Sequence, residues 1–182
     1  MVASENRAGL IVVGSYVPKT TAQLNQLLSC SGAPEAVVLE VDQLLADDPG
    51  AYLNATIEKV NERLAGGHDV VIHTSRKLIT GSDGESSLRI GSIVSHAVVQ
   101  TVRGVSAPLR FLIAKGGITS SDVATKALDA KRAMVLGQIL PGIPVWSLGK
   151  ASRLPNLPYV VFPGNVGDED ALAVAYQKLK QE

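Results

Sequence analysis

Hydrophobic positions along the chain follow two kinds of spacing in turn. Short unbroken apolar runs, typical of buried strands, are separated by segments where apolar residues return every three or four positions, as on one face of a helix. The runs predicted to be strands are 9–13, 36–41, 70–73 and 109–114. The segments predicted to be helices are 18–28, a stretch around 52–64, 87–102 and 120–128. This alternation predicts an α/β fold with a mostly parallel sheet.

The pattern changes in the C-terminal third of the chain. Three apolar runs, 132–140, 144–148 and 159–162, are separated by Pro and Gly with no helix between them, and a last helix is predicted over 168–180. Strands joined without helices can pair antiparallel. We therefore expect a single domain over residues 1–182, with a Rossmann-like three-layer arrangement of helices around the sheet and extra strands in its C-terminal third.

Composition and charge narrow the class of protein. With 182 residues, 46% of them hydrophobic, the chain is long enough for one domain with a sizeable core. The formal net charge is zero, so nothing indicates a nucleic-acid partner. The apolar runs are too short to span a bilayer and the N-terminus lacks the apolar segment of a signal peptide, so a soluble cytoplasmic protein is expected.

Cysteine and histidine give no indication of a metal site. Cys30 is the single cysteine, which excludes a disulfide within the chain, and the three histidines are scattered at positions 68, 73 and 96. Together, one cysteine and three scattered histidines do not offer the ligand spacing of a zinc site. Candidate chemistry must therefore come from the loops that follow the strands, where ligands bind in open parallel sheets.

The most unusual of these loops is KGGITSSD, which follows the fourth predicted strand. Gly116 and Gly117 allow a ligand to approach the backbone closely, and Thr119 or Ser120 could cap the next helix. Free amides at a helix start attract phosphate. The spacing matches neither a Walker A loop nor GxGxxG. The alternative is a tight strand-to-helix turn, with Thr119 and Asp122 forming a capping box.

Two further loops are weaker candidates. Gly14 and Ser15 end the first predicted strand, where Ser15 could contact a nucleotide or simply cap a helix. The loop PGNVG, which includes Gly164, follows the last predicted strand and precedes the acidic residues 168–170. These acidic residues favour a helix start but would repel a bare phosphate, so we expect this loop to meet a base, a ribose or a cation.

A fourth stretch, after the third predicted strand, contains possible anion-binding residues. Arg76 and Lys77 lie there, ahead of a helix that Ser86 or Ser87 is expected to cap. His73, at the end of the strand, is interpreted as a packed residue rather than a catalytic base.

Taken together, these stretches resemble a known family. The segments VVGSYVPKTTAQL, HTSR, FLIAKGGITSSDVATKAL, GQILPGIPVW and YVVFPGNVGDEDAL are similar to the C-terminal nucleotide-binding domain of four-carbon acid sugar kinases. The similarity runs from about Gly9 to the last predicted helix. It implies ATP-dependent phosphorylation of a threonate, an erythronate or a 3-oxo-tetronate.

The resemblance also implies a set of site residues. In that family the turn after the first strand, the glycine-hydroxyl loop and the PGNVG loop face ATP; the matching positions here are Ser15, Gly117, Ile118, Thr119, Ser120 and Gly164, to which the loop chemistry adds Gly116. Mg²⁺ would bridge the β- and γ-phosphates, with Asp122 or Asp168 as candidates to help hold it. Ser15 and the Gly164 loop would frame the nucleoside.

The sequence departs from the family in one large respect. It begins directly at the nucleotide domain, so the N-terminal domain that carries most of the acid-sugar site is expected on a separate chain or on a longer kinase, and no catalytic base is assigned. Two alternatives stay open. One is an ATP- or ADP-binding module without catalysis. The other is a dinucleotide-binding domain of an oxidoreductase, favoured only by Asp42 near the second predicted strand.

Overall fold

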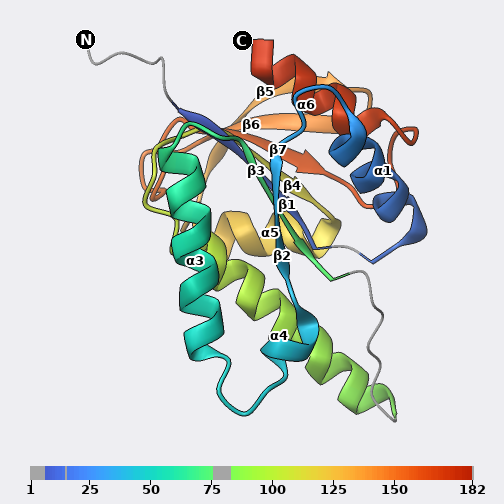
Figure 1. Ribbon diagram of the computed structural model, residues 1–182. Helices are drawn as coiled ribbons and strands as arrows, with labels where there is room; N and C mark the ends of the chain where they lie inside the picture. Colours follow the sequence, from blue (N-terminus) through green and yellow to red (C-terminus); the bar gives the residue numbers. More distant parts are fainter. Residues whose placement is uncertain (1–6, 15, 76–82, 182) are drawn as a thin grey trace.

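A single seven-stranded sheet organises the molecule (Figure 1). The computed structural model describes residues 7–14, 16–75 and 83–181. The strands are β1 (Ala8–Val13), β2 (Glu35–Leu39), β3 (Val70–Thr74), β4 (Leu109–Lys115), β5 (Ala133–Leu140), β6 (Ile143–Leu148) and β7 (Pro158–Phe162). Their order is β2-β3-β1-β4-β7-β6-β5. The first five strands in this order are parallel, whereas β6 is antiparallel to both β7 and β5.

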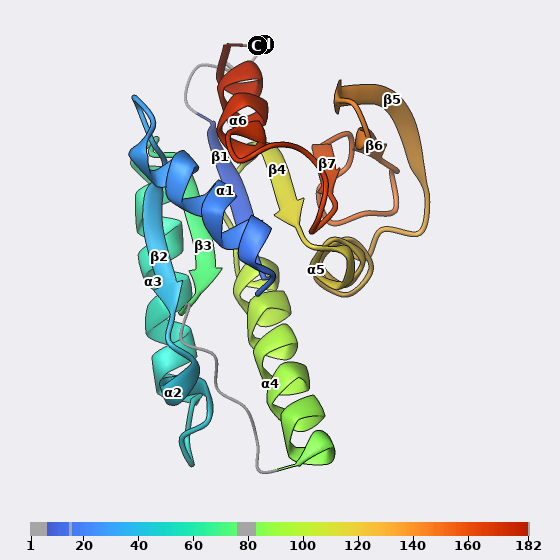
Figure 2. The same ribbon diagram turned by 90° about the vertical axis from the view of Figure 1, so that its right-hand side faces the viewer.

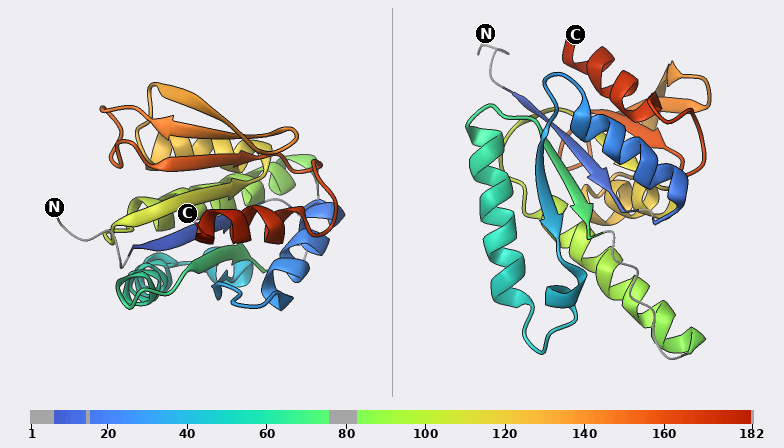
Figure 3. Two further views of the ribbon diagram at one scale, coloured as in Figure 1. Left: turned by 90° about the horizontal axis from the view of Figure 1, so that it is seen from above. Right: turned by 45° about the vertical axis from the view of Figure 1, so that its right-hand side comes forward.

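Helices cover both faces of the sheet (Figures 2 and 3). They are α1 (Pro18–Ser29), α2 (Val41–Leu44), α3 (Gly50–Ala65), α4 (Gly84–Arg103), α5 (Gly117–Asp122), the π-helix η1 (Val123–Ala127) and α6 (Ala171–Gln181). Residues of α1 and α6 pack in one core cluster and residues of α3, α4 and η1 in another. None of these helices is both long and apolar enough to cross a lipid bilayer.

The core is tight where β1 lies beside β4. Every residue of β1 is buried, and Ile11 and Val13 face the α1 side of the sheet while Leu10 and Val12 face the α4 side. Position 9 of this strand requires glycine, because the ring of Phe111 fills the space that a side chain would take. A Cβ built on Gly9 would lie 2.1 Å from Phe111 Cζ. A glycine within a strand often marks such a close approach.

The two edge strands of the sheet, β2 and β5, differ in how far other side chains cover them. On β2, side chains of α3 donate hydrogen bonds to backbone carbonyls: Arg63 donates to the carbonyl of Ala36, and the Tyr52 hydroxyl donates to that of Val38. On β5, three consecutive large apolar side chains, Met134, Val135 and Leu136, are 58–69% exposed. Figure 2 shows β5 at the end of the sheet opposite β2. An apolar strand edge of this kind is open to pairing with another strand.

The structure confirms the predicted α/β class, the mostly parallel sheet and the antiparallel strands of the C-terminal third. Three details were wrong. Helix α4 is capped by Asp83, whose side chain accepts from the Ser86 amide, and not by Ser86 or Ser87. Helix α6 begins at Ala171, so the acidic residues 168–170 precede it. The single turn α2 was not predicted, because four residues are too few for a periodic pattern.

Candidate functional site

The order in which strands are added to the sheet changes side at β1: β2 and β3 lie on one side of β1, and β4 lies on the other. From β1 the chain crosses through α1 to β2 and returns to β3, and α4 then carries it over β1 to β4. Strands β1 and β4 are neighbours, with Val13 opposite Lys115 at their carboxyl ends. A crevice at such a switch point is where open α/β sheets bind ligands. Gly14 and Gly116 are the first residues after the two strands.

Gly14 makes room for the loop that follows β4. A Cβ on Gly14 would lie 2.3 Å from Thr119 Oγ1. The amide of Gly14 also donates to the carbonyl of Lys115, at 3.4 Å. The turn after the first strand and the glycine-hydroxyl loop, which the sequence analysis considered separately, therefore meet at one point.

Free backbone amides distinguish the Gly116 turn. Gly116 has φ +119°, a conformation that favours glycine, and its amide donates to the Phe162 carbonyl at 2.8 Å. Helix α5 begins immediately afterwards, and the described part of the chain provides no acceptor for the amides of Gly117, Ile118 and Thr119. Gly117 is exposed, and a Cβ there would have no neighbour within 4 Å. Three donors at the start of a helix are thus accessible to an anion.

Ser120 differs from the other residues of this loop. Its hydroxyl donates to the carbonyls of Ala114 and Gly116, and its amide donates to Gly116. The buried Tyr159 hydroxyl donates to the Ser120 carbonyl at 2.6 Å, and burial raises the pKa of that phenol. The donors of Ser120 are thus used within the protein, where they close the turn and tie α5 to the sheet. Contact of Ser120 with the nucleotide stays a prediction.

A cavity of about 330 Å³ lies in front of this turn. Gly14 and the 116–119 segment form one side of it, and helix α4 forms an apolar wall opposite with Val94, Val98 and Val99. Tyr16, with 37% of its surface exposed, stands at the rim. The cavity therefore combines a small polar end that carries free amides with a larger apolar part, as is common in sites for small organic ligands.

Asp122 is the carboxylate in the lining of this cavity. It forms no capping box with Thr119, as the alternative interpretation expected. Instead it accepts from the Ser95 hydroxyl and pairs with Lys126, each at 2.8 Å. Burial raises the pKa of its carboxyl, but the hydrogen bonds from Lys126 and Ser95 outweigh burial and leave the pKa below its ordinary value. Asp122 thus stays ionised with both oxygens engaged.

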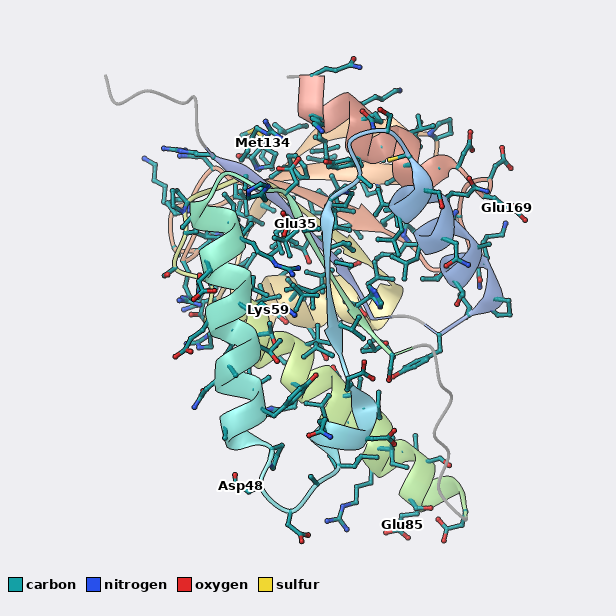
Figure 4. All side chains as sticks on the ribbon, viewed as in Figure 1. Glu35, Asp48, Lys59, Glu85, Met134 and Glu169 are labelled. Atoms are coloured by element: carbon teal, nitrogen blue, oxygen red, sulfur yellow. The ribbon has the colours of Figure 1, made fainter. Side chains whose placement is uncertain are left out.

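Gly164 lies on the other side of the Gly116 turn, next to β4, and does not line the cavity. Its carbonyl accepts from the Lys115 ammonium at 3.1 Å and from the Thr20 hydroxyl at 3.2 Å. Among the acidic residues that follow, Figure 4 shows Glu169 at the outer surface beyond α1. Ser15, Arg76 and Lys77 lie outside the described residues, so their expected roles stay predictions. Within the described residues no three His, Cys, Asp or Glu side chains are grouped to hold a metal ion.

Sequence comparison shows which family this chain belongs to. Residues 10–172, most of the chain, match the sequence model of a family described as the nucleotide-binding C-terminal domain. The chain belongs to this family. This confirms the resemblance to the C-terminal domain of four-carbon acid sugar kinases. The match includes β1, β4 and β7 and the loops that follow them. No curated protein matches this nucleotide-binding domain significantly.

Solved structures share the fold of the nucleotide-binding domain. A Bordetella bronchiseptica protein with a domain of unknown function, crystallised with citrate as a domain-swapped dimer, superposes with a TM-score of 0.71 at 21% identity, over 96% of this chain and 42% of that one. A Haemophilus influenzae protein of the same type gives 0.69 at 19%, over 94% and 40%. A Salmonella typhimurium protein provisionally described as a tRNA synthase gives 0.67 at 19%, over 94% and 41%. The nucleotide-binding domain thus spans about two fifths of these relatives.

Sequence reasoning missed two parts of the site. The apolar wall of α4 was interpreted only as core, because its valines have the spacing of any buried helical face. The contacts of Lys115, the first residue of the KGGITSSD segment, were not foreseen. A lysine that ends an otherwise apolar run, FLIAK, is the signal that could have suggested them, because an isolated charge at a buried position needs partners.

Proposed function

We propose that this domain binds ATP at the crevice between β1 and β4 and is the nucleotide-binding half of a kinase for a four-carbon acid sugar. The observation that carries the proposal is the set of unpaired amides of Gly117, Ile118 and Thr119 at the polar end of the cavity, beside two glycines that keep side chains away. Backbone amides at a helix start form an anion site. The family's description as nucleotide-binding supports the same ligand.

The geometry suggests how ATP would be held. The β- and γ-phosphates would accept hydrogen bonds from the amides of residues 117–119 and from the Thr119 hydroxyl. The apolar wall of α4 and the ring of Tyr16 offer a surface on which the nucleoside can pack. Ser15 and the Gly164 loop would meet the rest of the nucleotide from the other side of the turn. Phosphoryl transfer depends mainly on such positioning and on charge neutralisation.

Mg²⁺ fits this site as an ion carried by the nucleotide. Magnesium in phosphoryl-transfer sites keeps several waters and takes one or two carboxylates besides phosphate oxygens. Asp122 lines the cavity close to the amide end, and it could join that shell by exchanging Lys126 for a magnesium-bound water. Asp168 is exposed at the end of the loop that contains Gly164 and does not line the cavity. Of the two candidates we therefore favour Asp122. The ion would neutralise charge on the transferred phosphate.

The acid sugar would come from a second domain. Asp122, the carboxylate of the cavity, is engaged by Ser95 and Lys126, so we assign no residue of this chain as the base that accepts the sugar's proton. This engagement also favours a second candidate, a module that binds ATP or ADP without catalysis. The order of the sheet argues against a dinucleotide-binding oxidoreductase domain, because β3 separates β2 from β1 and places Asp42 two strands from the crevice.

ATP is expected to raise the melting temperature of the domain. A ligand that binds only the folded state, present at 100 times its dissociation constant, contributes about 2.7 kcal/mol. For a domain of this length that corresponds to a shift of roughly 5–10 °C. Differential scanning fluorimetry with ATP, ADP and NAD would measure it. A shift with NAD and none with ATP or ADP would contradict the proposed ligand.

Turnover is expected to need the acid-sugar domain. The domain alone, given ATP, Mg²⁺ and a tetronate, should release ADP no faster than without the tetronate. The same assay with an acid-sugar-binding domain of the family joined to it should approach ordinary kinase rates of about 1–100 s⁻¹. Such rates from the domain alone would overturn the division of the site between two domains. ATP binding without turnover in either assay would favour the non-catalytic module.

A further inference from the structure

We propose that Lys115 is a positioning residue that fixes the orientation of the Gly164 loop, defined as residues 163–168, so that the amides of this loop are presented to the nucleotide. The proposal rests on the proposed function for its ligand. The Lys115 side chain does not line the cavity, so it would affect ATP binding only by holding the Gly164 loop in place.

Lys115 is buried at the point where the two nucleotide loops meet. None of its surface is exposed, and its ammonium lies 2.6 Å from the Pro163 carbonyl, 3.1 Å from the Gly164 carbonyl and 4.2 Å from the centre of the Phe162 ring. The next residue, Gly116, donates its amide to Phe162. Strand β4 thus holds both the last residue of β7 and the start of the Gly164 loop.

Other side chains hold the remaining carbonyls of the loop in the same way. The Gln23 amide donates to Val166 and Asp168, at 3.0 and 2.7 Å. The Thr20 hydroxyl donates to Gly164 and the Lys19 ammonium to Gly167. All these donors come from α1 or from the end of β4, so the carbonyls of residues 163, 164, 166, 167 and 168 are drawn toward the body of the molecule.

The amides of the loop are left without partners as a result. A trans peptide unit places its N–H opposite its C=O, so a carbonyl turned inward points the amide of the following residue the other way. The amides in question belong to Gly164, Asn165, Gly167 and Asp168, and the described residues provide no acceptor for any of them. A run of outward amides is an anion-binding surface. The hydrogen bond from the Gly116 amide to Phe162 joins the start of this loop to the residue just ahead of the unpaired amides 117–119.

An ordinary core side chain could not replace Lys115 in this role. Burial, with a smaller effect of Lys19 nearby, lowers the pKa of Lys115 to about 8, which shows that the position disfavours the charge. Leucine or methionine would fill the same space without that cost, but would leave the Pro163 carbonyl without its donor. The loop could then turn over and present carbonyls, which repel phosphate.

The test is Lys115→Met, with two readouts. NMR order parameters of the amides of residues 164–168 in the protein without nucleotide should fall from about 0.85, typical of a rigid backbone, to below about 0.6. Affinity for ATP by calorimetry should fall by about 10-fold or more, since a hydrogen bond to a charged group contributes about 1.5–3 kcal/mol. Lys178→Met is the matched control, because that ammonium also donates to a backbone carbonyl, that of Ile139, but from an exposed position outside both loops. It should change affinity less than about two-fold, as expected for surface charges.

A second variant separates positioning from loss of stability. Val71→Ala removes buried methyl groups of β3, whose residues contact neither loop in the sheet pairing, and should destabilise the fold while leaving ATP affinity unchanged. If Lys115→Met does not fold, Lys115→Cys in a Cys30→Ala background can be alkylated with bromoethylamine while unfolded and then refolded, which restores the ammonium. Restored ATP affinity supports the proposal.

The outcomes distinguish this inference from the proposed function. Wild-type ATP affinity and order parameters in Lys115→Met would overturn the role of Lys115 while ATP binding by the wild-type protein still stood. No ATP binding by the wild-type protein would overturn the proposed function, and lower order parameters of amides 164–168 in the variant would then support only the orientation of the loop. Equal loss of affinity in Val71→Ala would reduce Lys115 to a structural residue.

Discussion

Replacing Gly117 by valine is expected to lower the affinity for ATP by at least about 100-fold, or about 2.7 kcal/mol, without lowering the melting temperature. Gly117 is exposed at the start of α5 and a Cβ there has no neighbour within 4 Å, so the fold has room for the side chain. The two methyl groups would stand in front of the unpaired amides of Gly117 and Ile118. A phosphate could then no longer reach both amides.

Gly84→Val is a closely matched control. Gly84 is also the first residue of its helix and is also exposed, and a Cβ added to it would likewise have no atom within 4 Å, but it lies outside the cavity lining. Calorimetric titration of both variants with ATP would measure the difference. Equal affinities in Gly117→Val and the wild-type protein would remove the Gly116 turn from the nucleotide site.

Replacing Gly9 by alanine is expected to destabilise the domain by about 3 kcal/mol or more, the upper part of the range for overpacked cores. The added methyl group would lie 2.1 Å from Phe111 Cζ, and the Phe111 ring is held by an edge contact with Tyr176 and by Arg110 over its face. Neither the ring nor the two paired strands can move away cheaply. Urea unfolding, or a fall in melting temperature of roughly 10 °C, would show the effect.

A double variant tests the cause of this destabilisation. Phe111→Leu removes the atoms that the new methyl group would meet, so Gly9→Ala should cost less in that background than in the wild type, with a coupling of about 1 kcal/mol or more. Gly84→Ala, in open space within a helix, should be neutral or slightly stabilising. A wild-type free energy of unfolding for Gly9→Ala alone would contradict the contact.

The fold could be predicted from the sequence because most of its elements have one dominant period. The buried parallel strands are continuous apolar runs, and the helices between them show their apolar face to the sheet. Two boundaries escaped because local hydrogen bonds decided them. Asp83 begins α4 earlier than predicted because its side chain accepts from the Ser86 amide. The π-helix at Val123–Ala127 is closed by a hydrogen bond from the Leu128 amide to the Val123 carbonyl, which the hydrophobic period does not indicate.

The site could be predicted only in part. Gly116, Gly117 and Thr119 were predicted because glycines and hydroxyls between a strand and a helix are a local signal, and their contact with the nucleotide stays a prediction. Ser120 could not be separated from Thr119 on that basis, because its hydroxyl turns inward to the carbonyls of Ala114 and Gly116, whose positions are set only in the folded turn. The same is true of Lys115, whose acceptors lie 48 and 49 residues further along the chain.

The polarity of the sheet limits how another domain can be attached to this one. β1 begins and α6 ends at the upper rim in Figure 1, whereas Gly14 and the Gly116 turn follow the carboxyl ends of β1 and β4, at the opposite rim. A domain fused ahead of Ala8 therefore starts about 20 Å, the length of a six-residue strand, from the crevice. A peptide that connects such a domain needs roughly six extended residues to cover this distance, so that a sugar hydroxyl bound by the other domain can reach the phosphate. Tethers attached at either terminus, in contrast, leave the nucleotide rim unobstructed.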